Sequence, residues 1–395
     1  MKRLFKYLFY IFFIPFWLII RLYPRSSKIW VFGSWFGKKY GDNSKALFEY
    51  VNKCHPDYKS IWLSRNPDVI NSLRKEGYKS YHANSFMGIW YSLNAGFIFV
   101  SSSKIDVNYL FINGAKWIQL YHGAPLKKVG LDDEFSKSDS LFQRRIVKHL
   151  FPFVYEFNFH LTTALSSEFS NILCSAFNLS SSQIEITGFP RNDNLFAKES
   201  EQIIDKINTK FNNPIKILYL PTFRSEIEKK DLFGGYGFNP NKFQRFLEKI
   251  NGVLISKGHF VDQNVSNDSS IERIFHLSDS DIKDVYVLAK DSNFLLTDYS
   301  SILFDYLLTD NPIIFTAFDL KEYISKNRQL YFQYEDVISG PVVKDWNDVM
   351  LKVEEILDHD NYLELRKKQK SRFNAFHDNL NAERVYQAIL RRFHH

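Results

Sequence analysis

The feature that most constrains the fold is an alternation of short apolar runs with amphipathic stretches, which begins near residue 28. The short runs are rich in β-branched and aromatic residues, and the stretches between them have apolar residues at helical spacing. Strands and helices that alternate in this way form parallel sheets with helices on both faces. The alternation occurs twice, on either side of a polar stretch at residues 197–213. We therefore predict an α/β protein with two doubly wound domains that face a cleft.

The predicted elements follow from these runs. In the first half the predicted strands are Ile29–Phe32, Ser60–Leu63, Tyr78–Tyr81, Phe97–Val100, Trp117–Tyr121, His160–Thr163 and Ile184–Thr187. The predicted helices there are Ser44–Asn52, Asp68–Glu76, Phe86–Asn94, Leu141–Phe157 and Glu168–Phe177. In the second half the predicted strands are Lys216–Leu220, Val253–Ser256, Val285–Leu288, Phe294–Thr297 and Ile313–Thr316. The predicted helices there are Asn241–Ile250, Ser301–Leu308, Leu320–Lys326, Asn347–Leu357, Asn361–Phe376 and Ala382–Phe393.

The length of 395 residues fits two domains of this kind. We expect a membrane-associating segment at residues 1–27 and an N-terminal domain at 28–197. A C-terminal domain follows at 214–380, and a C-terminal helix at 381–395.

The N-terminal segment carries most of the positive charge. The net charge is +7, and residues 1–28 hold six Lys and Arg residues and no acidic one, which leaves +1 for the rest. A nearly neutral folded body argues against nucleic-acid binding. The uncharged run Tyr7–Ile20 would reach about 21 Å as a helix, short of the roughly 30 Å of a bilayer core. We favour a peripheral anchor on an anionic leaflet, with a true span and an ordinary buried helix as alternatives.

Several function classes lack their signatures. The two cysteines, Cys54 and Cys174, cannot build a disulfide framework and have no zinc-ligand spacing, which suits a reducing compartment. P-loop, dinucleotide-binding and G-x-S-x-G hydrolase motifs are absent. The DxD pattern at residues 279–281 has no matching histidine or third carboxylate, so no metal site is expected.

In this fold ligands bind where parallel strands end, so residues just after each predicted strand are the candidate site. His122 follows the strand Trp117–Tyr121, and Gly123 and Pro125 favour a turn that would present it. A neutral imidazole can accept the proton of an attacking hydroxyl. The alternative is a capping or core histidine.

Three further strand ends carry polar side chains. Thr222 and Arg224 follow the strand Lys216–Leu220, and the guanidinium suits phosphate oxygens or else a surface ion pair. Lys257 and His259 follow the strand Val253–Ser256 as anion donors or parts of a solvated turn. At the third end, Gly188-Phe189-Pro190-Arg191-Asn192-Asp193, residues Arg191 and Asp193 line the cleft or form a turn and helix cap.

The richest strand end is Thr297-Asp298-Tyr299-Ser300-Ser301. Hydroxyls and free N–H groups at a helix start form an anion site, and the same serines can serve as plain caps. Asp305, about one turn into that helix, can reach a ribose hydroxyl or simply favour the helix dipole.

Together these segments resemble the CDP-glycerol glycerophosphotransferase family of teichoic-acid and capsule synthesis. The resemblance covers roughly residues 28–380. It rests on WVFGSWFGKKYGDNS, YHGAPLKKVG, GFPRND, LYLPTFR, KGH, DYSSILFDYLLTDNPIIF and QLYFQYEDVISGPVV, in this order. One departure is Ala124, where the family typically has threonine.

The resemblance implies a GT-B architecture, with the acceptor and the base on the first domain and a CDP-activated polyol on the second. It implies His122 as general base and His259 as a second catalytic group at the pyrophosphate. Donor phosphates and ribose would be bound by Arg224, Lys257, Ser300, Ser301 and Asp305. Gly123, Arg191, Asp193, Thr222 and Asp298 would line the cleft. No metal or cofactor is required by this pattern.

The function predicted on this basis is transfer of glycerol phosphate, or another polyol phosphate, from a CDP-linked donor, with release of CMP. The acceptor would be a hydroxyl of a lipid-linked saccharide or growing polymer at the cytoplasmic face of the cell membrane, bound through residues 1–27. The alternatives are a GT-B glycosyltransferase that uses a sugar nucleotide and a membrane-anchored scaffold without catalysis.

Overall fold

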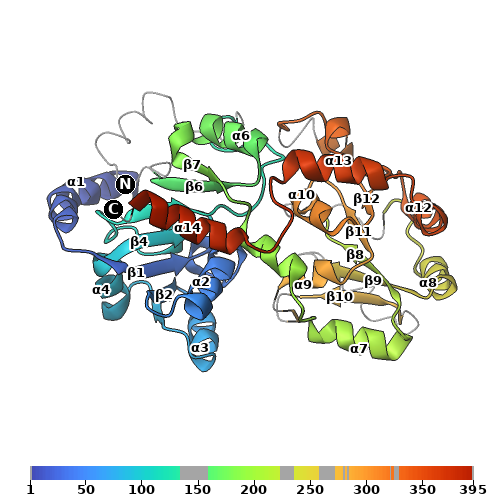
Figure 1. Ribbon diagram of the computed structural model, residues 1–395, viewed down its shortest axis with the longest axis horizontal. Coiled ribbons are helices and arrows are strands. Elements are labelled where there is room, and N and C mark those ends of the chain that lie inside the picture. Colours follow the sequence, from blue (N-terminus) through green and yellow to red (C-terminus); the bar gives the residue numbers. More distant parts are fainter. Residues whose placement is uncertain are drawn as a thin grey trace. The chain divides into compact units, whose positions relative to one another are not determined.

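The computed structural model describes residues 2–133, 159–222, 235–257, 272–278, 281–282, 284–320, 322–323 and 329–393. The chain forms two compact units (Figure 1). The first comprises Met1–Gly123, Val129–Asp193 and Leu380–His395, and the second comprises Ala124–Lys128 and Asn194–Asn379.

The first unit is built on a parallel seven-stranded sheet in the order β3-β2-β1-β4-β5-β6-β7. Its strands are β1 (Ser26–Gly33), β2 (Lys59–Ser64), β3 (Ser80–His82), β4 (Ala95–Val100), β5 (Lys116–Gln119), β6 (Leu161–Ala164) and β7 (Ile184–Ile186). Its helices are α1 (Lys2–Arg21), α2 (Asp42–Cys54), α3 (Pro67–Lys75), α4 (Phe86–Asn94), α6 (Ser167–Phe177) and α14 (Asn381–Phe393). The residues just before α3 and α4 cap these helices: Asn66 accepts from the N–H of Asp68, and Ser85 accepts from that of Gly88.

Aromatic side chains fill the core of the first unit. Trp30, Phe32 and Phe99 are fully buried, and the rings of Phe32 and Phe99 stack with centroids 4.5 Å apart. The C-terminal helix α14 completes this core, because Val385 and Ile389 are buried in it. Figure 1 shows α14 lying across the first sheet, far along the chain from the strands that it covers. The last helix therefore belongs to the first unit.

The second unit has a parallel five-stranded sheet in the order β10-β9-β8-β11-β12. Its strands are β8 (Ile215–Tyr219), β9 (Gly252–Lys257), β10 (Ile274–Leu277), β11 (Phe294–Thr297) and β12 (Ile313–Phe315). Its helices are α7 (Gln202–Phe211), α8 (Pro240–Lys249), α9 (Val285–Lys290), α10 (Ile302–Tyr306), α12 (Trp346–Asp358) and α13 (Leu363–Phe373). Trp346 is fully buried at the centre of its core.

The predicted α/β class with two parallel sheets is confirmed, and three local predictions need correction. Val285–Leu288 is not a strand but the start of helix α9, which the Asp284 side chain caps by accepting from the N–H of Tyr286 at 2.8 Å. The edge strand β10 was not predicted. The polar stretch 197–213 contains helix α7, which buries Ile204 and Ile207. The predicted helix Leu141–Phe157 lies outside the described residues, as does most of Leu320–Lys326.

Each sheet reverses its winding direction at one place. In the first unit the reversal lies between β1 and β4, and in the second between β8 and β11. Ligands of doubly wound sheets bind outside the carboxyl ends of the strands at such a reversal. The loops after these four strands are therefore where a ligand of each unit is expected.

Helix α1 covers the predicted apolar run and includes Pro15. Among the residues that the structure describes, none of the helices has both the length and the hydropathy of a bilayer span. Contacts of the helix with its own unit include the rings of Phe16 and Phe111, which lie edge to face at 6.3 Å, and Asn113, which donates to the carbonyl of Trp17 at 2.7 Å. Just after it, Arg25 donates to the carbonyls of Ser92 and Ala95, which fixes the entry of the chain into β1.

A histidine beside β5 gives the stability of the first unit a pH dependence. The Nδ1 atom of His160 accepts the N–H of Trp117 at 3.0 Å, so the ring is neutral in this arrangement. Burial lowers the pKa of His160 to about 4, with smaller contributions from Lys116 and Arg392. Between pH ~6.5 and 4 this histidine is protonated in the unfolded chain but not in the folded chain. The free energy of unfolding therefore falls as the pH is lowered through this range.

We predict that His160→Gln removes this part of the pH dependence, on the order of 2 kcal/mol between pH 7 and pH 4.5. Burial raises the pKa of Asp106 and of Asp193 to about 6, and these carboxyls act in the opposite direction. Wild type and His160→Gln both contain these carboxyls. The difference between their pH dependences of stability therefore reports on the histidine alone. Urea unfolding at pH 7 and pH 4.5 measures it, and parallel pH profiles would contradict the assignment.

Candidate active site

His122 stands on a tightly held turn at the end of β5. The backbone is left-handed at Tyr121, with φ +60°, and φ is +148° at Gly123. The side chain of Asn43 donates to the carbonyls of Leu120 and Tyr121 at 3.0 and 3.1 Å. A backbone in an unfavourable region persists only where its surroundings determine it, and such places are typical of functional sites.

The hydrogen bond of the His122 ring selects one tautomer. Its Nδ1 lies 3.1 Å from the carbonyl oxygen of Ser101, which can only accept, so Nδ1 carries the proton. Nε2 is then left with a lone pair, and the ring is partly exposed to solvent. This is the arrangement of a general base.

A buried ion pair supports the His122 turn from below. Arg191 pairs with Asp42, and their side chains are only 6% and 9% exposed. The same guanidinium nitrogen of Arg191 donates to the carbonyl of His122 at 2.8 Å. Arg191, predicted as a cleft-lining residue, thus positions the backbone of His122.

Asp106 connects the ends of β1 and β4. Its carboxylate accepts from the N–H groups of Phe36, Ser101 and Ser102 at 2.7–3.0 Å. Burial raises its pKa even though these bonds act to lower it. Because Asp106 fixes the Ser101 peptide, it also fixes the carbonyl that sets the tautomer of His122.

The predicted residue Asp193 is a helix cap. Its carboxylate accepts from the N–H groups of Asn381 and Ala382 at 3.0 and 2.9 Å, at the start of α14. At Gly188, φ is +73°, and a Cβ there would lie 1.9 Å from the Asn381 side-chain oxygen. Both residues of this segment therefore tie α14 to the first unit.

In the second unit the structure joins two predicted residues at the winding reversal. One carboxylate oxygen of Asp298 accepts from both the N–H and the hydroxyl of Thr222, at 2.8 and 2.6 Å. Asp298 is 1% exposed, and Tyr334 donates to its carbonyl at 3.1 Å. These bonds hold the loop after β8 against the loop after β11.

Ser300 and Ser301 follow Asp298 at the start of α10. Both are partly exposed, and neither hydroxyl has a hydrogen-bond partner within the described part of the chain. Lys257 is the last residue of β9 and is also partly exposed. These three donors stand at carboxyl ends of strands of one parallel sheet, as the sequence predicts.

Asp305 is fully buried, and Tyr286 donates to its carboxylate at 2.7 Å. The predicted ribose contact stays a prediction. Arg224 and His259 lie outside the described residues, as does most of the DxD pattern. Within the described ranges, no group of acidic, His and Cys side chains is arranged to hold a metal ion.

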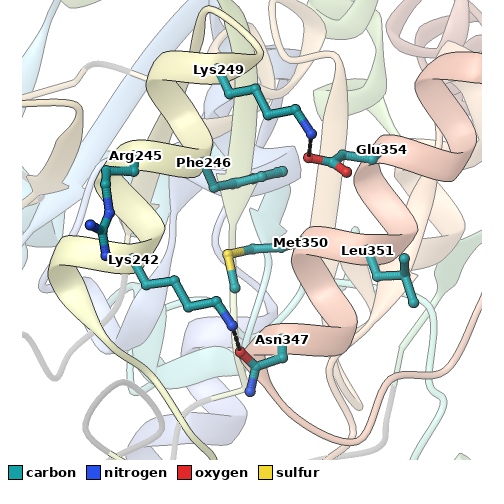
Figure 2. A pocket seen from close by; sticks show the side chains of 8 residues that line it. All are labelled: Lys242, Arg245, Phe246, Lys249, Asn347, Met350, Leu351 and Glu354. Carbon is teal, nitrogen blue, oxygen red and sulfur yellow. Dashed lines mark hydrogen bonds and ion pairs between the residues drawn. The ribbon is translucent and has the colours of Figure 1, made fainter.

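A groove between α8 and α12 lies on another part of the second unit. Figure 2 shows two contacts that join the helices beside it, Lys242 with Asn347 and Lys249 with Glu354, at 2.5 and 2.8 Å. None of the predicted site residues lines it.

Comparison with known proteins decides the family. The model of the CDP-glycerol:poly(glycerophosphate) glycerophosphotransferase family matches residues 16–391. The chain belongs to this family. The resemblance predicted from the motifs is confirmed over a longer range, and with it the enzyme class, a transferase.

Two relatives and one structure illustrate the relationship. A teichoic acid poly(glycerol phosphate) polymerase of Bacillus spizizenii is 31% identical over 91% of this chain and 89% of its own length. A teichoic acid glycerol-phosphate transferase of Staphylococcus aureus is 28% identical over 93% of this chain and 94% of its own. The structure of the wall teichoic acid polymerase TagF aligns with a TM-score of 0.73 at 25% identity, over 93% of this chain and 89% of that one. The predicted GT-B-like fold class is confirmed by this similarity.

Proposed function

We propose that this protein transfers glycerol phosphate from CDP-glycerol to a hydroxyl of a lipid-linked saccharide or growing teichoic-acid polymer and releases CMP. The observation that supports this most is the partly exposed His122, held as the Nδ1–H tautomer on a strained turn of the first unit. A histidine poised to accept a proton suits attack by a hydroxyl on phosphorus. Family membership supplies the donor class.

In the proposed mechanism Nε2 of His122 takes the proton of the acceptor hydroxyl as its oxygen attacks the β-phosphorus of the donor. The new oxygen–phosphorus bond forms as the bond to the CMP oxygen breaks, and CMP leaves with the electron pair. Lys257, Ser300 and Ser301 would stabilise negative charge on the phosphates, and the predicted contribution of Arg224 and His259 is of the same kind. None of the residues named here acts as a metal ligand in this mechanism.

The identity of the released nucleotide tests this proposal. Purified protein is incubated with a lipid-linked disaccharide and one donor in each reaction: CDP-glycerol, CDP-ribitol or a UDP-sugar. The released nucleotides are then separated by chromatography. We expect CMP from CDP-glycerol. Release of a nucleoside diphosphate from the sugar nucleotide, without CMP from either CDP-polyol, would indicate a glycosyltransferase instead.

We further propose that α1 rests on the membrane surface and keeps the enzyme near its lipid-linked acceptor. Its apolar side chains support this: Phe12 is 81% exposed, Ile19 63% and, just after the helix, Leu22 84%. Exposed apolar groups next to Lys and Arg residues suit the boundary of an anionic bilayer.

We predict that replacing Phe12, Ile19 and Leu22 together by serine lowers binding to vesicles with anionic lipid at least tenfold, as apolar area is lost from the contact. Phe86→Ser is the matched control, because Phe86 is 80% exposed on α4 of the same unit. Vesicle co-sedimentation measures both. Equal binding by the triple variant and wild type would exclude α1 as the contact.

A further inference from the structure

Three consecutive residues after β1 have a left-handed backbone. The φ angles are +46° at Trp35, +57° at Phe36 and +74° at Gly37. Only the last is glycine, and bulky residues in this conformation carry steric strain. Two aromatic residues in succession here require an explanation.

Four hydrogen bonds that involve side chains hold this turn. The N–H of Phe36 donates to Asp106 at 2.7 Å, and Arg65 donates to the carbonyl of Phe36 at 3.1 Å. The carbonyl of Gly37 accepts from the Ser64 hydroxyl at 2.7 Å. The indole N–H of Trp35 donates to Asp42, the partner of Arg191. Strain that is fixed so firmly points to a function of the turn.

The turn lies where a ligand of the first unit is expected. It follows β1 at the reversal between β1 and β4, where doubly wound sheets bind ligands. The ring of Trp35 lies 5.5 Å from that of His122, centroid to centroid. Phe36 is 46% exposed, although hydrogen bonds hold the backbone of its turn firmly in place. The partly exposed Trp35 ring thus lies beside His122, and the exposed Phe36 follows it in the same turn. Together they offer an apolar face to whatever brings its hydroxyl to His122.

The geometry points to the turn Trp35–Gly37 as the binding site for a sugar ring of the acceptor, with the aromatic side chains packing on its C–H face. This inference rests on the proposed function and adds the part of the acceptor that is recognised. A sugar ring has an apolar face that fits an aromatic side chain, whereas a polyol phosphate chain is anionic and lacks such a face. The turn therefore favours a saccharide-terminated acceptor over one that ends in polyol phosphate.

Phe36→Gly tests this, because glycine keeps the left-handed turn without strain and removes only the ring. Transfer from CDP-glycerol is measured with two acceptors: a disaccharide diphosphate with a short alkyl chain, and a glycerol phosphate oligomer. We expect KM for the disaccharide acceptor to rise about tenfold, with KM for CDP-glycerol and for the oligomer unchanged and Tm at least as high as in wild type. Phe36→Tyr keeps an aromatic ring and should have the wild-type KM, and Phe86→Ala should also leave the KM unchanged.

Three results would overturn the inference: an unchanged KM for the disaccharide acceptor, an equal rise for both acceptors, or a loss of vesicle binding in place of the KM effect. The last would assign the ring to lipid. Absence of any transfer by the wild-type protein would instead contradict the proposed function.

Discussion

His122→Ala is expected to lower kcat by about 10³-fold while CDP-glycerol still binds, because the variant loses proton transfer but keeps the second unit intact. His122 belongs to the first unit, and the predicted donor residues Lys257, Ser300 and Ser301 belong to the second. The measurement is single-turnover CMP release together with equilibrium binding of CDP-glycerol.

His82→Ala is the matched control for this variant, because His82 is another partly buried histidine at a strand end of the first unit. It should keep wild-type turnover. Normal turnover by His122→Ala would remove this residue as the base. Loss of donor binding in the same variant would show a role other than proton transfer.

The second large effect is expected at the buried ion pair. Arg191→Met removes the cation and leaves the Asp42 carboxylate buried, which typically costs about 3–5 kcal/mol. We expect the unfolding midpoint of the first unit to fall by about 10 °C in calorimetry. Turnover should fall as well, because Arg191 also holds the carbonyl of His122.

The double variant Asp42→Asn/Arg191→Met separates the pair from its surroundings. Asparagine tolerates the left-handed backbone of Asp42, where φ is +61°, and removes the unpaired charge. The double variant should therefore be more stable than Arg191→Met alone. If the two losses simply add, the ion pair is not what stabilises this region.

The parts of the fold that depend on local pattern could be predicted from the sequence. Most strands are predictable because each is a short buried run, and His122 is a candidate because it follows one of them. Helix α9 resembles a strand in sequence because Val285-Tyr286-Val287-Leu288 is rich in residues that favour strands. The capping residue Asp284 decides the matter in the structure.

The support of the site could not be predicted in this way, because it joins distant parts of the chain. Asn43 bonds the carbonyl of Leu120, and Asp42 pairs with Arg191, across separations of 77 and 149 residues. The sequence shows that Asp42, Asn43 and Asp106 are polar, but not that they are buried. The motif WVFGSWFGKKYGDNS contained the signal, since it joins the strained aromatic turn to Asp42 and Asn43. Likewise, the sequence shows that α14 is amphipathic, but it does not show that the helix packs on the first sheet.

The central claim concerns which bond is broken, and the fate of the β-phosphorus tests it most directly. CDP-glycerol labelled with ³²P at the β-phosphorus is incubated with the protein and a lipid-linked disaccharide, and the label is followed in acceptor and nucleotide. The proposed reaction predicts unlabelled CMP and labelled acceptor, with both lost in His122→Ala. Label recovered in CDP, with an unlabelled product, would show attack at carbon and contradict the account.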